Sequence, residues 1–259
     1  GITEATDVGT YIAIATPEEN YAFEDGSTDA KTITWKINAK EVAVIWEDVT
    51  SFVYNGKPQA PSATAESGVD GEILNIVRTT GINVGTYTST ARLESVTGGS
   101  GKISNYILTN TTKQFTITNE KIVGSVTIKG TNQYGSTLIA ETIVSPEDAT
   151  LTYQWYSNTD NSTSGGTPID GATKKEYTVG DGLVGKYIYV VVTAEKENYD
   201  KISFTDITDD EINGSKTVTK VSLQKPTING TYTYNGKNQT LNINNYDANK
   251  MNISGNTGI

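Results

Sequence analysis

The sequence predicts an all-β protein, an elongated tandem array of small β modules, and three observations support this prediction. Threonine, asparagine, serine, glycine, valine, isoleucine and 15 tyrosines dominate the composition, whereas leucine and methionine are scarce. This composition is typical of strands and tight turns. Alternating apolar and polar residues recur between turn residues, as expected for half-buried strands. Two sequence patterns occur twice within the 259 residues, which indicates repeated modules.

The charge and composition disfavour several classes of function. The net charge is −10 and the only arginines are Arg78 and Arg92, so the surface should repel a phosphate backbone and we expect no nucleic-acid partner. The chain contains neither cysteine nor histidine, which removes disulfides, thiolate metal sites and the commonest general base. No apolar run approaches the roughly 18 residues of a membrane span. We therefore expect no membrane insertion in this segment and no cofactor.

Two repeated patterns divide the chain. Val-Gly-Thr-Tyr begins at Val8 and again at Val84, and an alternating strand follows each copy, "KTITWKI" and "KQFTITN". Tyr-Asn-Gly-Lys-x-Gln begins at Tyr54 and again at Tyr234. Only one stretch contains both patterns in order, and it is read as a complete module. The predicted segments are a C-terminal half-module (1–40), a complete module (41–120), a different module (121–220) and an N-terminal half-module (221–259).

The third segment has the pattern of an immunoglobulin-like β-sandwich. Trp155 lies in the middle of the strand "LTYQWYSN", where such a sandwich buries its core tryptophan. Tyr187 follows Gly-Lys at the start of "YIYVVVTA", where such folds place a tyrosine corner. Because the chain has no cysteine, plain packing must replace the usual disulfide around Trp155.

These patterns resemble two families of bacterial surface repeats. "YQWY", "IDGAT" and "GKYIYVVVTA" are similar to bacterial immunoglobulin-like repeats. The series YNGK-x-Q, VGTY and NY resembles MBG-type repeats, which are mostly-β modules of cell-surface adhesins. The resemblance implies a secreted, non-catalytic structural or adhesive segment at the bacterial cell surface. Its partners would be the neighbouring modules of the same protein, and the resemblance carries over no catalytic residues.

The Asn-Gly pairs of the second pattern predict turns. Asn55-Gly56 and Asn235-Gly236 lie between alternating segments, and Asn-Gly is favoured in type I′ hairpin turns because both central residues need positive φ. We therefore expect structural hairpin turns that set strand register. The alternative is a pair of loops that present a ligand-binding surface.

Four aromatic residues are candidates for ligand binding. Trp35 and Trp46 flank the junction "WKINAKEVAVIW", and Tyr11 and Tyr87 end the two Val-Gly-Thr-Tyr copies. The simplest interpretation is that they pack module cores and the interface between modules. The alternative is an exposed platform on which a glycan stacks or to which a host surface protein binds.

Two groups of carboxylates are candidates for a calcium site and for a catalytic acid–base pair. A solvated acidic loop is favoured over a calcium site for the first group, because no calcium-loop spacing accompanies it. This first group consists of Asp206, Asp209, Asp210 and Glu211. The second group could supply the acid and base of a glycosidase only across a cleft, and nothing in the sequence marks one. This second group consists of Glu18, Glu19, Glu24 and Asp25. We expect no enzymatic activity.

The two ends of the chain read as parts of one pattern. "NTGI" followed by "TEATDVGTY" parallels "TTGI" followed by "NVGTY" in the complete module. We interpret residues 221–259 and 1–40 as complementary halves of one module, each of which would expose strand edges by itself. The expectation is strand complementation in a head-to-tail association, in which residues 221–259 of one molecule complete residues 1–40 of the next.

Overall fold

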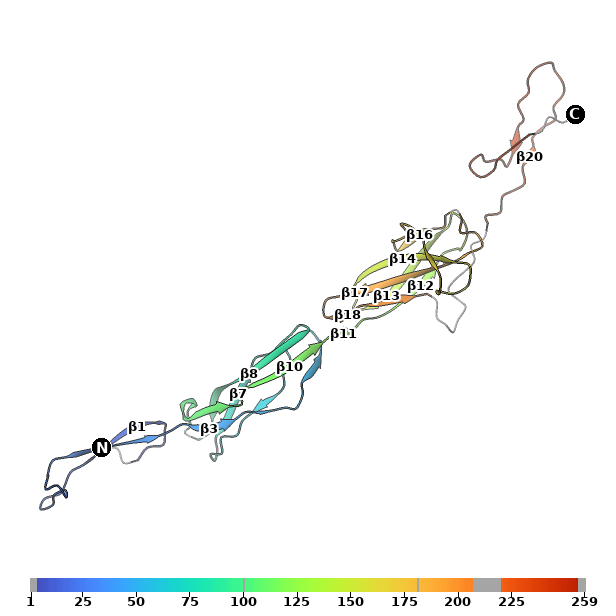
Figure 1. The fold of residues 1–259 in the computed structure, drawn as a ribbon. Coiled ribbons are helices and arrows are strands. Elements are labelled where there is room, and N and C mark those ends of the chain that lie inside the picture. Colours follow the sequence, from blue (N-terminus) through green and yellow to red (C-terminus); the bar gives the residue numbers. More distant parts are fainter. Residues whose placement is uncertain (1–3, 100, 181, 207–219, 256–259) are drawn as a thin grey trace. The chain divides into compact units, whose positions relative to one another are not determined.

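The structure is a computed structural model of the chain, and it describes residues 4–99, 101–180, 182–206 and 220–255. The protein is all-β, as the sequence predicts, and strands follow one another along the described part of the chain (Figure 1). No helix in this described part has the length and apolarity of a membrane span. The chain divides into two compact units. Unit 1 comprises Gly1–Val123, Ser145–Thr150 and Ala194–Ile202, and unit 2 comprises Gly124–Val144, Leu151–Thr193 and Ser203–Ile259.

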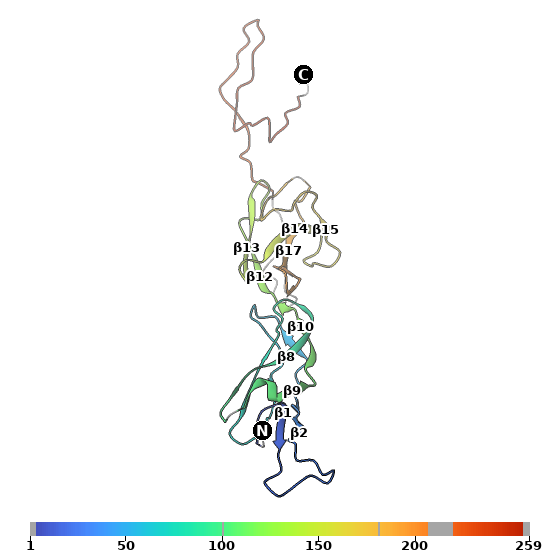
Figure 2. The same ribbon diagram turned by 90° about the vertical axis from the view of Figure 1, so that its left-hand side faces the viewer.

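Unit 1 begins with a hairpin, in which β1 (Gly9–Ala15) pairs antiparallel with β2 (Lys31–Ile37) (Figure 2). Gly9 lies opposite Ile37, and Tyr11 lies opposite Trp35. Because side chains alternate across a strand, Tyr11 and Trp35 share one face, where both are half-buried, whereas Ile12 on the other face is 51% exposed. These two strands form a two-stranded sheet by themselves.

Segment 41–120, which the sequence predicts to be a complete module, contains a sheet of four strands. The strand order is β5 (Ser51–Val53), β10 (Thr112–Thr118), β8 (Gly85–Thr97) and β7 (Ile73–Arg78). β8 pairs antiparallel with β10, with Gly85 opposite Ile117 and Tyr87 opposite Phe115. The hairpin has the corresponding register, with Gly9 opposite Ile37 and Tyr11 opposite Trp35. The two Val-Gly-Thr-Tyr copies therefore form the same strand pairing.

Shorter ladders connect the strands of unit 1. β3 (Lys40–Ala43) pairs in parallel with β9 (Tyr106–Thr109), β4 (Ile45–Trp46) pairs antiparallel with β6 (Ala63–Thr64), and β11 (Glu120–Lys121) pairs in parallel with β18 (Tyr199–Asp200). A 3-10 turn, η1 (Ile103–Asn105), directly precedes β9. One core contains Val42, Leu74 and Tyr106, and a second contains Ala60, Phe115 and Ile117.

Unit 2 is built on two sheets that share one core (Figures 1 and 2). The first sheet has the order β12 (Val123–Lys129), β13 (Thr137–Ser145) and β16 (Glu176–Thr178). The second has the order β15 (Thr167–Pro168), β14 (Thr150–Asn158), β17 (Tyr187–Glu195) and β19 (Ile202–Thr205). Leu138 of the first sheet packs in the same core as Trp155 and Val190 of the second. Inward-facing residues of both sheets thus remove apolar surface from water, which stabilises the unit.

Trp155 lies at the centre of this core. Its side chain is 0% exposed, and its indole Nε1 donates a hydrogen bond of 2.9 Å to the carbonyl oxygen of Lys174. Its ring lies 5.7 Å from that of Tyr177. Packing and one hydrogen bond to a backbone carbonyl therefore hold the Trp155 side chain without a disulfide.

The described residues at the C-terminal end form only a short ladder. β20 (Thr227–Ile228) pairs antiparallel with β21 (Ile243–Asn244). No residue between 220 and 255 is buried, and Tyr234 is 92% exposed. This segment therefore has no core of its own within the part that the structure describes.

The two Tyr-Asn-Gly-Lys turns have the same conformation, but the predicted hairpin type is wrong. The Asn55 side-chain oxygen accepts a hydrogen bond of 2.9 Å from the Lys57 N–H, and Asn235 repeats this bond at 3.0 Å. Only Gly56 and Gly236 have positive φ, at 72° and 69°. A type I′ turn would need positive φ at the asparagines as well. The asparagine side chain instead stabilises the turn locally, and β5 before it pairs in parallel with β10.

Candidate functional site

A candidate site in unit 1 lies where the hairpin meets segment 41–120. A pocket of about 310 Å³ opens there between the two segments. It is lined by Thr6, Asp7, Val8, Ile37, Asn38, Lys40, Val69, Glu72, Asn105 and Tyr106. The hairpin contributes the residues just before β1 and the end of β2 to this lining, and residues 40–106 contribute Lys40, Val69, Glu72, Asn105 and Tyr106.

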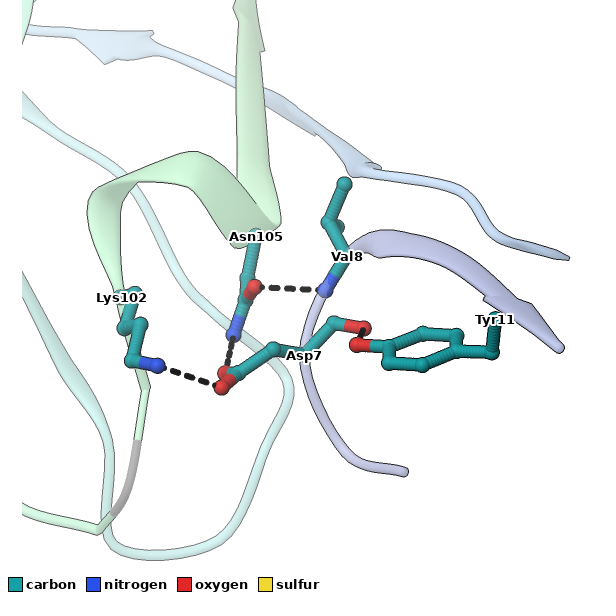
Figure 3. Close-up of polar contacts among 5 residues, drawn as sticks. All are labelled: Asp7, Val8, Tyr11, Lys102 and Asn105. Atoms are coloured by element: carbon teal, nitrogen blue, oxygen red, sulfur yellow. Dashed lines mark hydrogen bonds and ion pairs between the residues drawn. The ribbon is translucent and has the colours of Figure 1, made fainter. Parts of the chain in front are cut away.

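The Asn105 side chain binds two groups of the hairpin at once (Figure 3). Its Oδ1 accepts a hydrogen bond of 3.0 Å from the Val8 backbone N–H. Its Nδ2 donates a hydrogen bond of 3.0 Å to Oδ1 of Asp7. Because a side-chain amide offers one acceptor and two donors, asparagine suits a partner that pairs a backbone N–H with a carboxylate.

Two further contacts fix Asp7. Lys102 Nζ forms an ion pair with Asp7 Oδ2 at 2.6 Å, and the Tyr11 hydroxyl donates a hydrogen bond of 2.6 Å to the Asp7 carbonyl oxygen (Figure 3). The hydrogen bonds from Lys102 and Asn105 lower the pKa of Asp7, and the Asp7 carboxylate raises the pKa of Lys102. Water reaches both side chains, so the ion pair adds little stability compared with the amide contact.

Local structure places Asn105 at this point. The Tyr106 N–H closes η1 on the Ile103 carbonyl oxygen, so the chain turns sharply before β9. Tyr106 then begins β9, where it is 9% exposed and lies opposite Lys40 of β3. Since β3 follows β2 after only two residues, the parallel pairing of β9 with β3 brings Asn105 to the start of β1.

The deeper end of the pocket contains a second polar pair. The Tyr106 hydroxyl donates a hydrogen bond of 2.5 Å to Oε2 of Glu72. Burial raises the pKa of the Tyr106 hydroxyl, and the bond to Glu72 raises it further. The Asp7 and Glu72 carboxylates are thus both engaged within the site. The hydrogen bonds of this site hold the start of the hairpin, at Asp7 and Val8, against the η1 turn at Asn105.

The four aromatic candidates are half-buried, and each packs within its own segment. The Tyr11 and Trp35 rings lie 4.9 Å apart in the hairpin. Tyr87 stacks on Phe115 at 5.4 Å, and the Trp46 indole donates a hydrogen bond of 2.8 Å to the Asn110 carbonyl oxygen. The structure therefore brings together one pair, Tyr11 and Trp35, and places the other two in separate contacts.

The remaining candidates have structural surroundings. Asp206 Oδ2 accepts a hydrogen bond of 3.0 Å from the Ile128 N–H, whereas Asp209, Asp210 and Glu211 lie outside the described residues. Within the described ranges, no cluster of three or more acidic side chains could hold a metal ion. Tyr187 is half-buried, and the hydroxyl on this strand that donates to a backbone oxygen belongs to Tyr189, which bonds Thr163 at 3.1 Å.

No local sequence pattern assigns a role to Asn105, Asp7 or Lys102. The signal that the sequence does contain is the Asn-Tyr pair, which recurs after each Val-Gly-x-Tyr strand. In comparisons with known proteins, no protein-family model matches the chain, and no curated protein is significantly similar to it.

Proposed function

We propose that the chain is a non-catalytic structural or adhesive segment of a bacterial cell-surface protein, a stalk in which β modules follow one another. The observation that carries this proposal is the junction in unit 1, where Asn105 binds Val8 and Asp7. A side chain that ties the start of one repeat to the next is expected in a chain that must transmit force or hold modules in line. The matching strand registers of the two Val-Gly-Thr-Tyr copies support repetition of one module type.

The module identities form part of the same proposal. The two Tyr-Asn-Gly-Lys turns share their hydrogen bonds, which supports MBG-like segments at 41–120 and 221–259. The matching registers of β1 with β2 and of β8 with β10 support one at 1–40. The buried Trp155 between two sheets supports an immunoglobulin-like module at 121–220. An extracellular location follows from these resemblances.

We also propose that the terminal half-modules complement each other head to tail. In the complete module, Tyr54 and Phe52 pack against the core that contains Phe115 and Ile117. The hairpin presents Trp35 and Ile37 at the equivalent positions, both only half-buried. In residues 221–255, the counterpart of Tyr54 is Tyr234, which is 92% exposed. Each half thus exposes the apolar groups that the other half would cover.

Sedimentation analysis of the full chain over a range of concentrations tests this association. The expected result is a mass that rises with concentration and returns to that of one chain when residues 240–259 are deleted. Trp35→Ala should weaken the association, whereas Ile12→Ala, on the opposite face of the hairpin, should leave it unchanged. A constant monomer mass, or equal effects of the two substitutions, would contradict head-to-tail pairing.

A carbohydrate- or host-protein-binding module is the second candidate, because the Tyr11–Trp35 pair lies together and is only partly covered. Paired aromatic rings suit the apolar face of a sugar. Binding to a panel of glycans and mucins, compared between the wild-type chain and its Trp35→Ala and Trp46→Ala variants, distinguishes the two functions. Loss of binding in Trp35→Ala alone would favour this candidate, and the absence of any binding by the wild type would remove it.

A further inference from the structure

The Asn-Tyr pair ends a turn at three places in the chain. The tyrosine N–H bonds the carbonyl oxygen three residues before it in each case. The donors are Tyr21 (to Glu18, 3.0 Å), Tyr106 (to Ile103) and Tyr199 (to Lys196, 3.1 Å). Each turn follows a strand that begins near a Val-Gly-x-Tyr sequence: β1, β8 and β17. The tyrosine N–H contact is therefore repeated, although the asparagine backbone differs: φ is positive at Asn20 and Asn198, whereas Asn105 lies in the 3-10 turn η1.

In two of the three places, the asparagine binds an Asx-Val-Gly turn, meaning aspartate or asparagine followed by valine and glycine. Asn105 binds the turn that begins at Asp7, as described above. Asn198 repeats both contacts in unit 1, because its Oδ1 accepts a hydrogen bond of 2.7 Å from the Val84 N–H and its Nδ2 donates one of 3.3 Å to Oδ1 of Asn83. The same two atoms of the asparagine are used each time.

The strands beside these two sites also correspond. Tyr106 lies opposite Lys40, and Tyr199 lies opposite Glu120, each in a parallel ladder. Lys40 and Glu120 occupy the same place in the repeat, three residues after Ile37 and Ile117 respectively. Two independent copies thus show one mode of recognition. The asparagine side-chain amide makes two hydrogen bonds to the Asx-Val-Gly turn, and a parallel ladder begins at the tyrosine.

Among the residues that the structure describes, none occupies the third copy, Asn20-Tyr21, in this way. No hydrogen bond in the described part of the chain involves the Asn20 side chain. Its backbone φ of 76° is close to the 68° of Asn198, so Asn20 has the backbone conformation of that occupied copy, whereas Asn105 lies in a 3-10 turn. Tyr21 is 73% exposed, in contrast with 9% for Tyr106.

We propose that the Asn20-Tyr21 turn is a binding site for the Asx-Val-Gly turn of another β module of this repeat type. Asn20 Oδ1 accepts from the valine N–H, Asn20 Nδ2 donates to the Asx side chain, and the strand after the partner's module pairs in parallel with the chain from Tyr21. The inference rests on the proposed function, since it supplies the contact by which a preceding module would be held.

The test uses a full-length chain as the probe. In an Asn198→Ala/Tyr199→Ala variant, the turn at Asn83–Gly85 loses the amide contacts of Asn198, and Tyr54 separately loses its ring contact with Tyr199, which spans 5.5 Å. Hydrogen exchange of the Val84 amide should be faster in this probe than in the wild type. The unlabelled probe is then added, up to about 1 mM, to ¹⁵N-labelled wild-type chain, a range suited to weak contacts. The Asn20 side-chain amide and Tyr21 backbone signals should shift with concentration.

Val84→Pro added to the probe supplies the matched control, because proline has no N–H to donate. This control probe should produce no shift, and neither should the original probe added to a labelled Asn20→Ala chain. Three results would overturn the proposal: an unchanged Val84 exchange rate in the probe, no shift of the Asn20 or Tyr21 signals, or equal shifts with the control probe. Both probes carry the same terminal halves, so head-to-tail association contributes equally to the two titrations. A failure here therefore leaves the proposed function standing.

Discussion

At the scale of single residues, one asparagine does more for the junction than the charges around it. Asn105 satisfies a backbone N–H and a carboxylate together, whereas the Lys102–Asp7 ion pair is open to water. A typical net hydrogen bond contributes about 0.5–1.5 kcal/mol to stability, and an exposed ion pair contributes about 0–1 kcal/mol. The amide contacts should therefore dominate.

Asn105→Ala should release the start of the hairpin. The Val8 N–H would lose its acceptor, and we expect its hydrogen exchange to rise by roughly tenfold, which corresponds to about 1.4 kcal/mol. Lys102→Ala, which removes only the ion pair, should change Val8 exchange much less. Amide exchange measured by NMR on both variants decides this, and equal effects would show that the charge pair holds the junction.

The ion pair should respond to pH at both extremes. Since the pKa of Asp7 in the fold lies below its usual value of 3.8, the contribution of its carboxylate is complete above that value and is lost as pH falls through the lowered pKa. Since the pKa of Lys102 lies above its usual value of 10.5, its contribution is complete below that value and is lost as pH rises through the raised pKa. Titration of the Asp7 carboxyl by NMR should show a midpoint that moves upward in Lys102→Ala. An unchanged midpoint would mean that Lys102 does not stabilise the carboxylate.

At the scale of elements, the sequence predicted strands better than it predicted the contacts between them. The alternation in "KTITWKI", in "KQFTITN" and around Trp155 predicted β2, β10 and β14, because strand periodicity is a local property. The turn at Asn55 was predicted with the wrong type, because its asparagine side chain bonds the backbone in a way that the Asn-Gly signal does not reveal. The parallel ladder of β3 with β9 joins segments far apart in sequence, so no local pattern indicates it. The site around Asn105 depends on that ladder and was missed for the same reason.

Trp155→Ala should unfold or strongly weaken the two-sheet core of unit 2. Truncation of a buried tryptophan costs about 3–5 kcal/mol, and no disulfide compensates for the cavity. Trp46→Ala, in unit 1, serves as the control, because it removes a half-buried side chain with one hydrogen bond. A thermal melt should lose or lower one transition in Trp155→Ala and retain it in Trp46→Ala. Wild-type transitions in Trp155→Ala would show that the core does not depend on this residue.

At the scale of the whole molecule, the proposal is that repeated modules act in series. Asn105 and Asn198 use the same atoms on the same type of turn, and the ladders that follow them have the same register. This asparagine contact suits a stalk that holds a distal region away from a surface, because the same contact fixes successive repeats to one another. The absence of histidine and cysteine is consistent with this role but does not specify it.

Small-angle X-ray scattering of the full chain tests the central claim most directly. A compact protein of 259 residues would have a radius of gyration of about 18 Å. Modules arranged in series predict a value well above this, with a distance distribution that extends in a long tail, and the value should rise further in Asn105→Ala as the junction loosens. A radius of gyration near 18 Å for the monomeric wild-type chain would contradict the serial arrangement.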